Sequence, residues 1–469
     1  MKIDNDIAPI PTEEDEGLQL RAVRSLEKKA VKGTYFVTVA YGLSLSLRLV
    51  SSIVLSRLFA PELFGVLALV TTFIVGLNLF SHIGLEASII QNPRGDEPEF
   101  LNTAWTIQVI RGLGVFLLTI PMAWPVAHFY HEPRMIWLLP ALGFGSAIAG
   151  FTSPSMMTLA RHLGVGRLSL NELLQQVIQF AVTLIWALYQ PSLIALVAGR
   201  IVSELIRMLV SYWMLPEIRP RFAWEKSAVH ELITFGRWIL IGTALTFLAL
   251  QSDRLILGKL VTFSALGVYG IAFSLSDIPR QIILQFCSRV GFPFIAKFSD
   301  RPRPEYRTIL RKYRLPVLAA GALLLIVVIC SGDLFIVHVY DKRYHGAAWM
   351  IGILAIGLWH TLLYSTAYPA VLSLQKSHYN AFAYLVYCIT LFVALPLGYH
   401  WFGMVGAVVA VAFSDLPVYF VTLFSAHREG VGLLSQDVGM TLAFLASLTL
   451  ALLLRSSIGL SLPFAHIPW

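Results

Sequence analysis

Several charged side chains of this sequence lie inside long apolar runs, where they could bind an anion or move a cation. In one run Arg200, Glu204 and Arg207 are spaced four and three residues apart, which places them on one face of a helix. Guanidinium groups bind phosphate through paired hydrogen bonds. The candidate anion-binding residues are therefore the arginines within apolar runs, Arg48, Arg111, Arg200, Arg207, Arg237 and Arg280.

Carboxylates in the same runs are candidates for coupling transport to a proton or sodium gradient. They are Asp415, Asp253, Glu204 and Asp277. Each of these charged groups also has a structural interpretation. Arg200, Glu204 and Arg207 fit equally well a neutralised ladder that packs helices, and Arg237 and Arg280 could extend to the lipid headgroups.

The composition places these charges in a membrane protein. Of 469 residues, 57% are hydrophobic and 13% are charged, about half the charged share of an ordinary soluble protein. So many apolar residues could supply roughly thirteen segments of some twenty residues, the length that crosses a bilayer. This excludes a cytosolic globular enzyme and a nucleic-acid binder, although the net charge is +8. A charge at bilayer depth costs at least about 2.5 kcal/mol, so each one needs a partner or a water-filled cavity.

Apolar runs separated by short polar breaks predict an all-α polytopic bundle, since backbone groups in lipid need internal partners. The candidate spans are 34–56, 63–90, 104–127, 135–160, 168–189, 193–214, 229–251, 264–296, 315–338, 347–373, 379–401, 404–424 and 437–454. With the N-terminus in the cytoplasm, 21 Lys and Arg residues fall on the cytoplasmic side and 7 on the other. This threefold asymmetry predicts a cytoplasmic N-terminus.

The segment Leu55–Val66 aligns with Leu257–Val268 at an offset of 202 residues, and Arg57 matches Lys259. Each segment follows the first span of a group of six, which predicts two six-helix lobes related by a parallel repeat around a central cavity. The predicted domains are a cytoplasmic acidic tail with a basic amphipathic segment (1–33), an N-lobe (34–214), a cytoplasmic linker (215–228), a C-lobe (229–425) and a C-terminal segment (426–469). Whether 437–454 forms a thirteenth membrane helix, and on which side the chain ends, stays open.

No Walker loop, HExxH motif or clustered Cys/His set occurs in the sequence, so we expect no catalytic residue, no resident metal and no cofactor. The three cysteines lie far apart inside apolar runs, which indicates packing and not a disulfide framework.

Short segments spread along the chain resemble a known family. They are Lys28–Gly33, Leu55–Gly65, Ile83–Gln91, Asn102–Trp105 and Gln251–Lys259. These resemble the polysaccharide-transporter branch, with its Wzx-type flippases, of the multidrug/oligosaccharidyl-lipid/polysaccharide exporter superfamily. The resemblance covers about residues 30 to 425.

The resemblance implies a flippase that moves undecaprenyl-diphosphate-linked oligosaccharide units, for O-antigen, capsule or exopolysaccharide, across the bacterial inner membrane by alternating access. The expected partners are this polyprenyl-diphosphate-linked glycan and membrane lipids, then a glycan polymerase with its chain-length machinery, and no nucleic acid. One alternative is a multidrug/cation antiporter of the same superfamily, which should line its cavity with carboxylates and aromatic side chains. An alternative of another class is a membrane-embedded glycan polymerase or glycosyltransferase, for which no large external loop is evident.

Overall fold

The computed structural model describes residues 39–82, 84–162, 164–374, 376, 378–464 and 467. The side chains of residues 165, 235–242, 244–245 and 380 lie outside this description. The acidic tail and the basic segment predicted for 1–33 also lie outside it. Every regular element of the described residues is a helix, as an all-α membrane bundle requires.

The helices of the first half begin with Val39–Leu58. They continue with α2 (Pro61–Phe80), α3 (Leu85–Gln91), η1 (Pro93–Asp96), α4 (Pro98–Tyr130), α5 (Met135–Gly150), α6 (Ser155–Arg161), α7 (Val165–Tyr189) and α8 (Leu193–Met214). A non-helical stretch, 215–225, then leads to α9 (Lys226–Leu260).

The second half contains α10 (Phe263–Ser276), α11 (Ile278–Phe286), the π-helical turn η2 (Cys287–Gly291), α12 (Phe292–Ala296), α13 (Arg303–Val339), η3 (Lys342–Tyr344), α14 (Ala347–Ser373), α15 (His378–Phe413), α16 (Leu416–Arg428) and α17 (Leu434–Ser457). Helix α15 is broken at Phe402 and Gly403, where the backbone is not helical.

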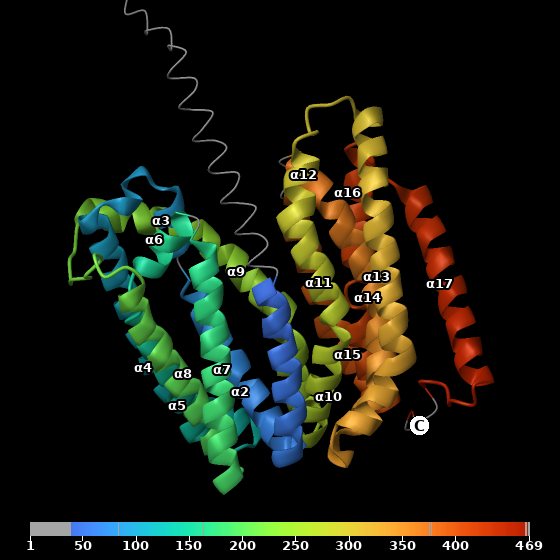
Figure 1. The fold of residues 1–469 in the computed structure, drawn as a ribbon, viewed down its shortest axis with the longest axis horizontal. Coiled ribbons are helices and arrows are strands. Elements are labelled where there is room, and N and C mark those ends of the chain that lie inside the picture. The colour runs from blue at the N-terminus through green and yellow to red at the C-terminus, as the bar shows by residue number, and fades with distance from the viewer. Residues whose placement is uncertain are drawn as a thin grey trace, which may run out of the picture.

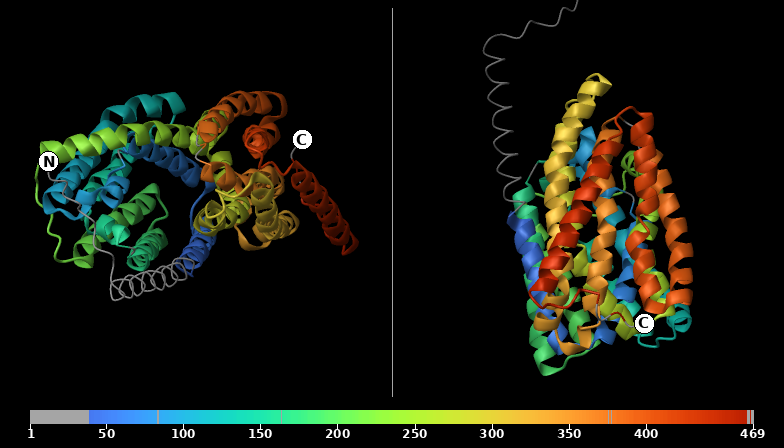
Figure 2. Two further views of the ribbon diagram at one scale, coloured as in Figure 1. Left: turned by 90° about the horizontal axis from the view of Figure 1, so that it is seen from above. Right: turned by 90° about the vertical axis from the view of Figure 1, so that its right-hand side faces the viewer.

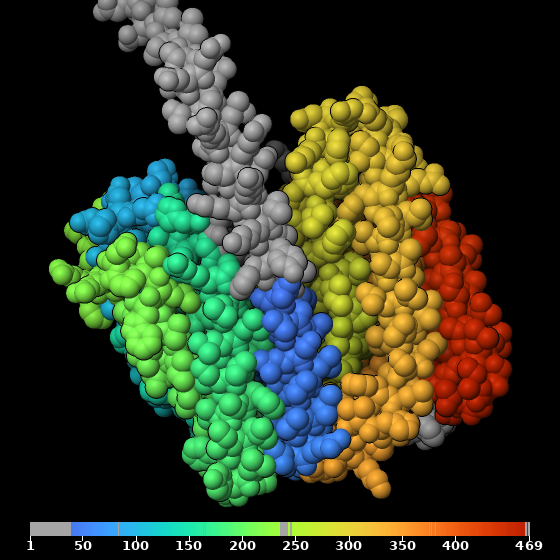
Figure 3. All heavy atoms as spheres, viewed as in Figure 1, coloured from blue at the N-terminus to red at the C-terminus, as the bar shows by residue number. Residues whose placement is uncertain are grey.

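The helices gather in two groups (Figures 1 and 2). Helices α2 to α8 lie on one side and α11 to α17 on the other, and the long α9 runs between them. The Val39–Leu58 helix lies at the surface between α7 and the second group (Figure 3). A repeat that relates the two whole groups stays a prediction.

Among the described residues, eight helices are long and apolar enough to cross a membrane, or nine if the bent pair α5–α6 counts as one span. The protein is a multi-pass membrane protein, with fewer clear spans than the thirteen expected. Three charges interrupt α8, and the predicted span 264–296 is divided into α10, α11, η2 and α12. The predicted spans 379–401 and 404–424 form one apolar stretch, Ala381–Arg428.

The two groups of helices meet at the end of the bundle where α2 and α10 begin, called here the Pro61 end. An added Cβ on Gly65 would lie 1.9 Å from the carbonyl oxygen of Phe263, and one on Gly267 would lie 1.9 Å from that of Pro61. Only glycine allows backbones to approach so closely. The two contacts are reciprocal, because Pro61 and Gly65 correspond to Phe263 and Gly267 at the offset of 202 residues.

Two cations add a second reciprocal contact at the Pro61 end. Arg57 donates from Nη2 to the carbonyl oxygen of Val339 (3.3 Å), at the end of α13. Lys259 donates from Nζ to the carbonyl oxygen of Phe129 (2.5 Å), near the end of α4. Both cations lie where a helix carries its negative partial charge, which favours the contact. Arg57 and Lys259 are also the residues that the offset pairs, so local two-fold symmetry holds at this end of the bundle.

We predict that Gly65→Ala prevents the close approach of α2 and α10, because the new methyl group would overlap a carbonyl oxygen. Overpacking of this kind typically costs about 1–3 kcal/mol. The measurement is maleimide labelling of Ser56→Cys, a fully buried position five residues before the start of α2, in purified protein whose native cysteines are replaced by serine. Labelling should become faster in the Gly65→Ala background.

The matched control is Gly114→Ala on α4, where an added Cβ meets nothing within 4 Å. This change should leave the labelling rate of Ser56→Cys unaltered. Equal rates in the Gly65 and Gly114 variants would show that the crossing does not keep this end closed.

Candidate functional site

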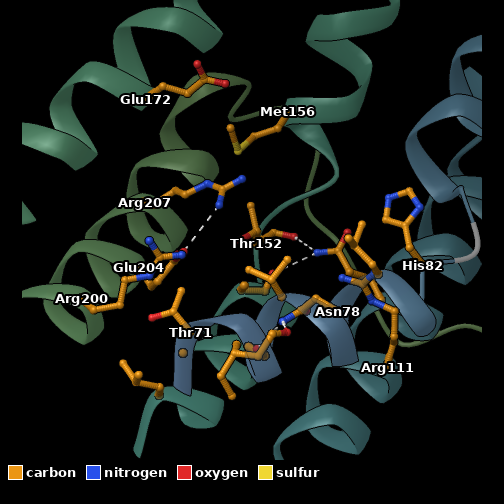
Figure 4. A pocket seen from close by; sticks show the side chains of 18 of the residues that line it. Thr71, Asn78, His82, Arg111, Thr152, Met156, Glu172, Arg200, Glu204 and Arg207 are labelled. Atoms are coloured by element: carbon orange, nitrogen blue, oxygen red, sulfur yellow. Dashed lines mark hydrogen bonds and ion pairs between the residues drawn. The ribbon is translucent and has the colours of Figure 1, made fainter. Parts of the chain in front are cut away.

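A cavity of about 670 Å³ lies among α2, α4, α5, α7 and α8 (Figure 4). It is called here the first cavity. Its polar lining includes Thr71, Asn78, His82, Gln108, Thr152, Arg111, Arg200, Glu204 and Arg207. The first cavity therefore contains three of the six predicted anion-binding arginines.

Helix α8 contributes three charges to the first cavity. The Glu204 side chain is 6% exposed, and its two oxygens face Arg200 Nη2 at 2.9 Å and Arg207 Nη1 at 3.5 Å. Spacings of four and three residues put all three on one helical face, as predicted from the sequence. Arg207 Nε is buried and has no hydrogen-bond partner among the described residues. One carboxylate is thus shared by two arginines.

Arg111 on α4 lies on the opposite side of the first cavity, near His82 (Figure 4). Its Nε atom is buried without a hydrogen-bond partner, and none of the described carboxylates forms an ion pair with it. A guanidinium group in this condition can accept an anionic ligand without first giving up a protein partner.

Glycines and amides around Arg111 determine its position. An added Cβ on Gly112 would lie 2.6 Å from the carbonyl oxygen of Ser146, so α4 and α5 pack closely there. One turn earlier, Gln108 Nε2 donates to the carbonyl oxygens of Gly150 (3.0 Å) and Thr152 (3.1 Å). These carbonyls become available at the break after α5, where α5 and α6 are bent by 64°. Gln108 therefore fixes the wall from which Arg111 reaches the cavity.

A smaller cavity of about 270 Å³, the second cavity, lies among α9, α10, α11, α14, α15 and the start of α16. Three of the four predicted coupling carboxylates line it: Asp253, Asp277 and Asp415. Glu204 does not, because it belongs to the first cavity. The second cavity also contains Arg280, which forms an ion pair with Asp277 three residues before it.

Two of the three carboxylates in the second cavity, Asp415 and Asp253, accept hydrogen bonds from hydroxyl groups. Asp415 accepts hydrogen bonds from Thr361 Oγ1 (3.0 Å) and Tyr364 OH (3.3 Å). Asp253 Oδ2 accepts one from Tyr269 OH (2.7 Å), and Asp253 Oδ1 is buried without a partner among the described residues. The second cavity thus contains a free carboxylate oxygen, which a proton or a small cation could occupy.

Arg48 does not line the first cavity. It is exposed on the Val39–Leu58 helix, and its Nη2 donates to Gln281 Oε1 on α11 (3.3 Å). Gln281 Nε2 in turn donates to Asp277 Oδ2 (3.0 Å). Arg48 therefore contacts the second group of helices. The side chain of Arg237, on α9, lies outside the described residues.

Several residues at these cavities are not among the sequence candidates. In the first cavity they are His82, Asn78 and Gln108, and in the second Arg254, Tyr364 and Tyr387. Gln108 could have been found, since it lies three residues before Arg111 and shares its helical face. The tyrosines had no such signal, because their partners are distant in sequence.

The described residues contain no group of three or more His, Cys, Asp and Glu side chains that could hold a metal ion.

A family model described as "Polysaccharide biosynthesis protein" matches residues 54–349, more than half of the sequence. The chain belongs to this family. The match confirms the resemblance found in the sequence, and it spans the first cavity and all of α13. A curated relative, the teichuronic acid biosynthesis protein TuaB of Bacillus subtilis (strain 168), is 23% identical over 67% of this chain and 66% of its own length.

Two further relatives are similar at the same level. The lipopolysaccharide biosynthesis protein WzxC of Escherichia coli (strain K12) is 22% identical over 59% of this chain and 56% of its own length. The succinoglycan biosynthesis transport protein ExoT of Rhizobium meliloti (strain 1021) is 23% identical over 63% of this chain and 57% of its own length. The chain thus matches less than two thirds of the length of each of these relatives.

Solved structures share the fold. The lipid II flippase MurJ, in an inward closed conformation, aligns with a TM-score of 0.66 at 12% identity and covers 88% of this chain and 91% of its own. A multidrug resistance MATE family transporter, in an inward-facing conformation, aligns with a TM-score of 0.65 at 12% identity over 82% of this chain and 94% of its own. At such low identity the likeness establishes the fold alone.

We predict that Asp277→Asn destabilises the protein, because it leaves the Arg280 guanidinium without its carboxylate. The two side chains are 8% and 19% exposed, and breaking a buried pair typically costs about 3–5 kcal/mol. The check is the thermal unfolding midpoint of the purified protein in detergent, which should fall clearly.

Glu305→Gln is the matched control for this prediction. It breaks the Arg301–Glu305 pair, whose side chains are 53% and 48% exposed. Such pairs contribute about 0–1 kcal/mol, so the midpoint should hardly move. A shift for Asp277→Asn as small as that of the control would contradict a stabilising role for the buried pair.

Proposed function

We propose that this protein is a flippase that moves undecaprenyl-diphosphate-linked oligosaccharide units across the bacterial inner membrane. The observation that carries the proposal is the pairing pattern in the first cavity, where Arg200 and Arg207 share one buried carboxylate and Arg111 has none among the described residues. Membership of a polysaccharide biosynthesis family, and relatives named for succinoglycan transport and lipopolysaccharide biosynthesis, support a glycan-linked substrate.

The chemistry of the headgroup explains why such arginines are needed. A diphosphate cannot leave water for a low-dielectric interior unless cations and hydrogen-bond donors replace its hydration. Arg111 and Arg207 each present a buried Nε without a partner, and guanidinium groups match phosphate oxygens bidentately. In our proposal the diphosphate binds between α4 and α8, while the polyprenyl tail remains in lipid.

Not every charge at the first cavity is positive. Glu86 and Glu172 also line it, but both are exposed. The buried carboxylate is Glu204, which is already paired with two arginines. The inner part of the cavity therefore has an excess of positive charge, as an anionic substrate requires.

The excess of Lys and Arg on one side of the predicted spans supports a cytoplasmic N-terminus. In that orientation the Pro61 end faces the periplasm. The first cavity is lined by His82 and Leu85, which lie beyond the other end of α2. We therefore infer that the described conformation presents the arginines to the cytoplasmic side, where a lipid-linked unit would enter.

The second cavity supports a coupling role for the carboxylates. It contains three carboxylates, Asp253, Asp277 and Asp415, but only two arginines among its described lining residues, Arg254 and Arg280. The Oδ1 atom of Asp253 also lacks a hydrogen-bond partner among the described residues. We propose that a proton or a sodium ion binds at this cluster during turnover. The same observation favours the alternative function, a cation antiporter, for which the second cavity would be the substrate site.

We predict that Arg111→Ala abolishes export of the surface glycan, while Arg111→Lys retains part of it, because lysine keeps the charge but loses the bidentate fork. Arg48→Ala should also reduce export. The measurement is complementation of a strain that lacks this gene, with surface glycan and cytoplasmic-side lipid-linked units both quantified.

Arg301→Ala, which removes an exposed cation next to α13, is the control for Arg111→Ala and should export normally. Loss of the flippase causes lipid-linked units to accumulate, whereas loss of a drug exporter does not. Normal export in the Arg111→Ala strain would rule out the proposed role of the first cavity.

We also predict that Asp415→Asn makes export insensitive to the coupling gradient, since an amide cannot exchange a proton and binds a cation poorly. The check is uptake of a labelled lipid-linked unit into inverted membrane vesicles, with and without an ionophore that collapses the proton or the sodium gradient. A variant that responds to the ionophore as fully as the native protein would place coupling elsewhere.

A further inference from the structure

Glu204, on α8, lies between two arginines of the first cavity. Its two oxygens contact Arg200 at 2.9 Å and Arg207 at 3.5 Å, and all three side chains line the cavity. Figure 4 shows the two arginines directed toward the Glu204 carboxylate, with Arg111 on the other side. A carboxylate therefore occupies the guanidinium atoms that an incoming phosphate needs.

A transporter must release its substrate as well as bind it. Three unpaired arginines in a low-dielectric cavity would hold a diphosphate tightly and would be costly to keep when the cavity is empty. One buried carboxylate solves both problems. When the cavity is empty, Glu204 lowers the net charge contributed by α8 from +2, for Arg200 and Arg207 alone, to +1. When the headgroup is bound, Glu204 competes with it for the two guanidinium groups.

The geometry shows which arginine exchanges more easily. The contact of Glu204 with Arg207 is at the limit of hydrogen-bond length, and Arg207 Nε has no partner. The contact with Arg200 is shorter, although the Arg200 side chain is 52% exposed. Of the two arginines on α8, Arg207 can therefore exchange its contact with Glu204 for a bound anion at the lower cost in free energy.

We propose that Glu204 is a built-in competitor for the anionic headgroup, which limits affinity so that the diphosphate can leave. This inference rests on the proposed function of the first cavity. When the diphosphate binds Arg207 and Arg111, Glu204 loses one of its two arginines and lies near a second anion. The bound state is thereby raised in free energy, and the return of Arg207 to Glu204 favours release.

The test uses the purified full-length protein in detergent and inorganic pyrophosphate as the probe, with binding measured by titration calorimetry. Glu204→Gln removes the competing charge and keeps the shape of the side chain. We expect its Kd for pyrophosphate to be at least about tenfold lower than that of the native protein. In cells, the same variant should export less glycan, because release becomes slower.

Glu172→Gln is the matched control. Glu172 lines the same cavity but is exposed, and it forms no ion pair with the arginines among the described residues. Its Kd should change less than about twofold. Glu204→Asp, which keeps the charge but shortens the side chain by one carbon, should give an intermediate Kd, and it decides the question if Glu204→Gln does not fold.

The outcomes separate this inference from the proposed function. If Arg111→Ala weakens pyrophosphate binding and Glu204→Gln leaves it unchanged or weaker, the competitor role of Glu204 is wrong and the anion cavity stands. If neither the native protein nor Glu204→Gln binds pyrophosphate, the anion-binding function of the first cavity is itself wrong. Tighter binding by Glu204→Gln with weaker binding by Arg111→Ala supports both.

Discussion

The cost of placing arginine at membrane depth governs how this bundle is built, because each such side chain must find a carboxylate, a set of carbonyls or a wet cavity. Arg280 forms an ion pair with Asp277, and Arg200 and Arg207 share Glu204. Arg111 forms no ion pair with any of the described carboxylates. The incompletely paired cations, Arg111 and Arg207, both line the first cavity. This coincidence is the physical basis for proposing an anionic ligand there.

The same rule explains how α17 is attached. Arg314 of α13, 1% exposed, binds Asp437 near the start of α17 at 2.8 Å, and Tyr419 donates a further hydrogen bond to that carboxylate. At the other end of α17, Arg455 pairs with Asp333 of α13. Two buried ion pairs thus fix one helix against its neighbour at both ends. Losing a partner from such a pair is expensive, so both pairs oppose a shift of α17 along α13.

Sequence patterns predicted the local features of the candidate site well and the distant ones poorly. The shared face of Arg200, Glu204 and Arg207 follows from helical spacing alone, and the structure shows it. Spacing could not reveal that Asp253, Asp277 and Asp415 meet. Asp253 lies in α9, Asp277 between α10 and α11, and Asp415 between α15 and α16, and the packing of these segments depends on the whole fold. The predicted span 315–338 leaves Arg314 outside the apolar run, whereas the residue is buried within α13. A positive charge at the start of a span looks the same in sequence whether it faces water or a carboxylate of another helix.

The Val39–Leu58 helix makes polar contacts with both groups of helices. Ser44 donates to Gln176 on α7 at 2.8 Å, and Arg48 donates to Gln281 on α11 at 3.3 Å. Gln281 donates to Asp277, which also binds Arg280 in the second cavity. One helix therefore has hydrogen bonds to both groups of helices. These bonds are long or involve neutral partners, so each contributes little and can be exchanged. The Pro61 end differs, since there glycine crossings and charged contacts to helix ends hold the groups together. A bundle with tight contacts at one end and exchangeable ones near its middle can change the separation of its two groups without breaking either group apart.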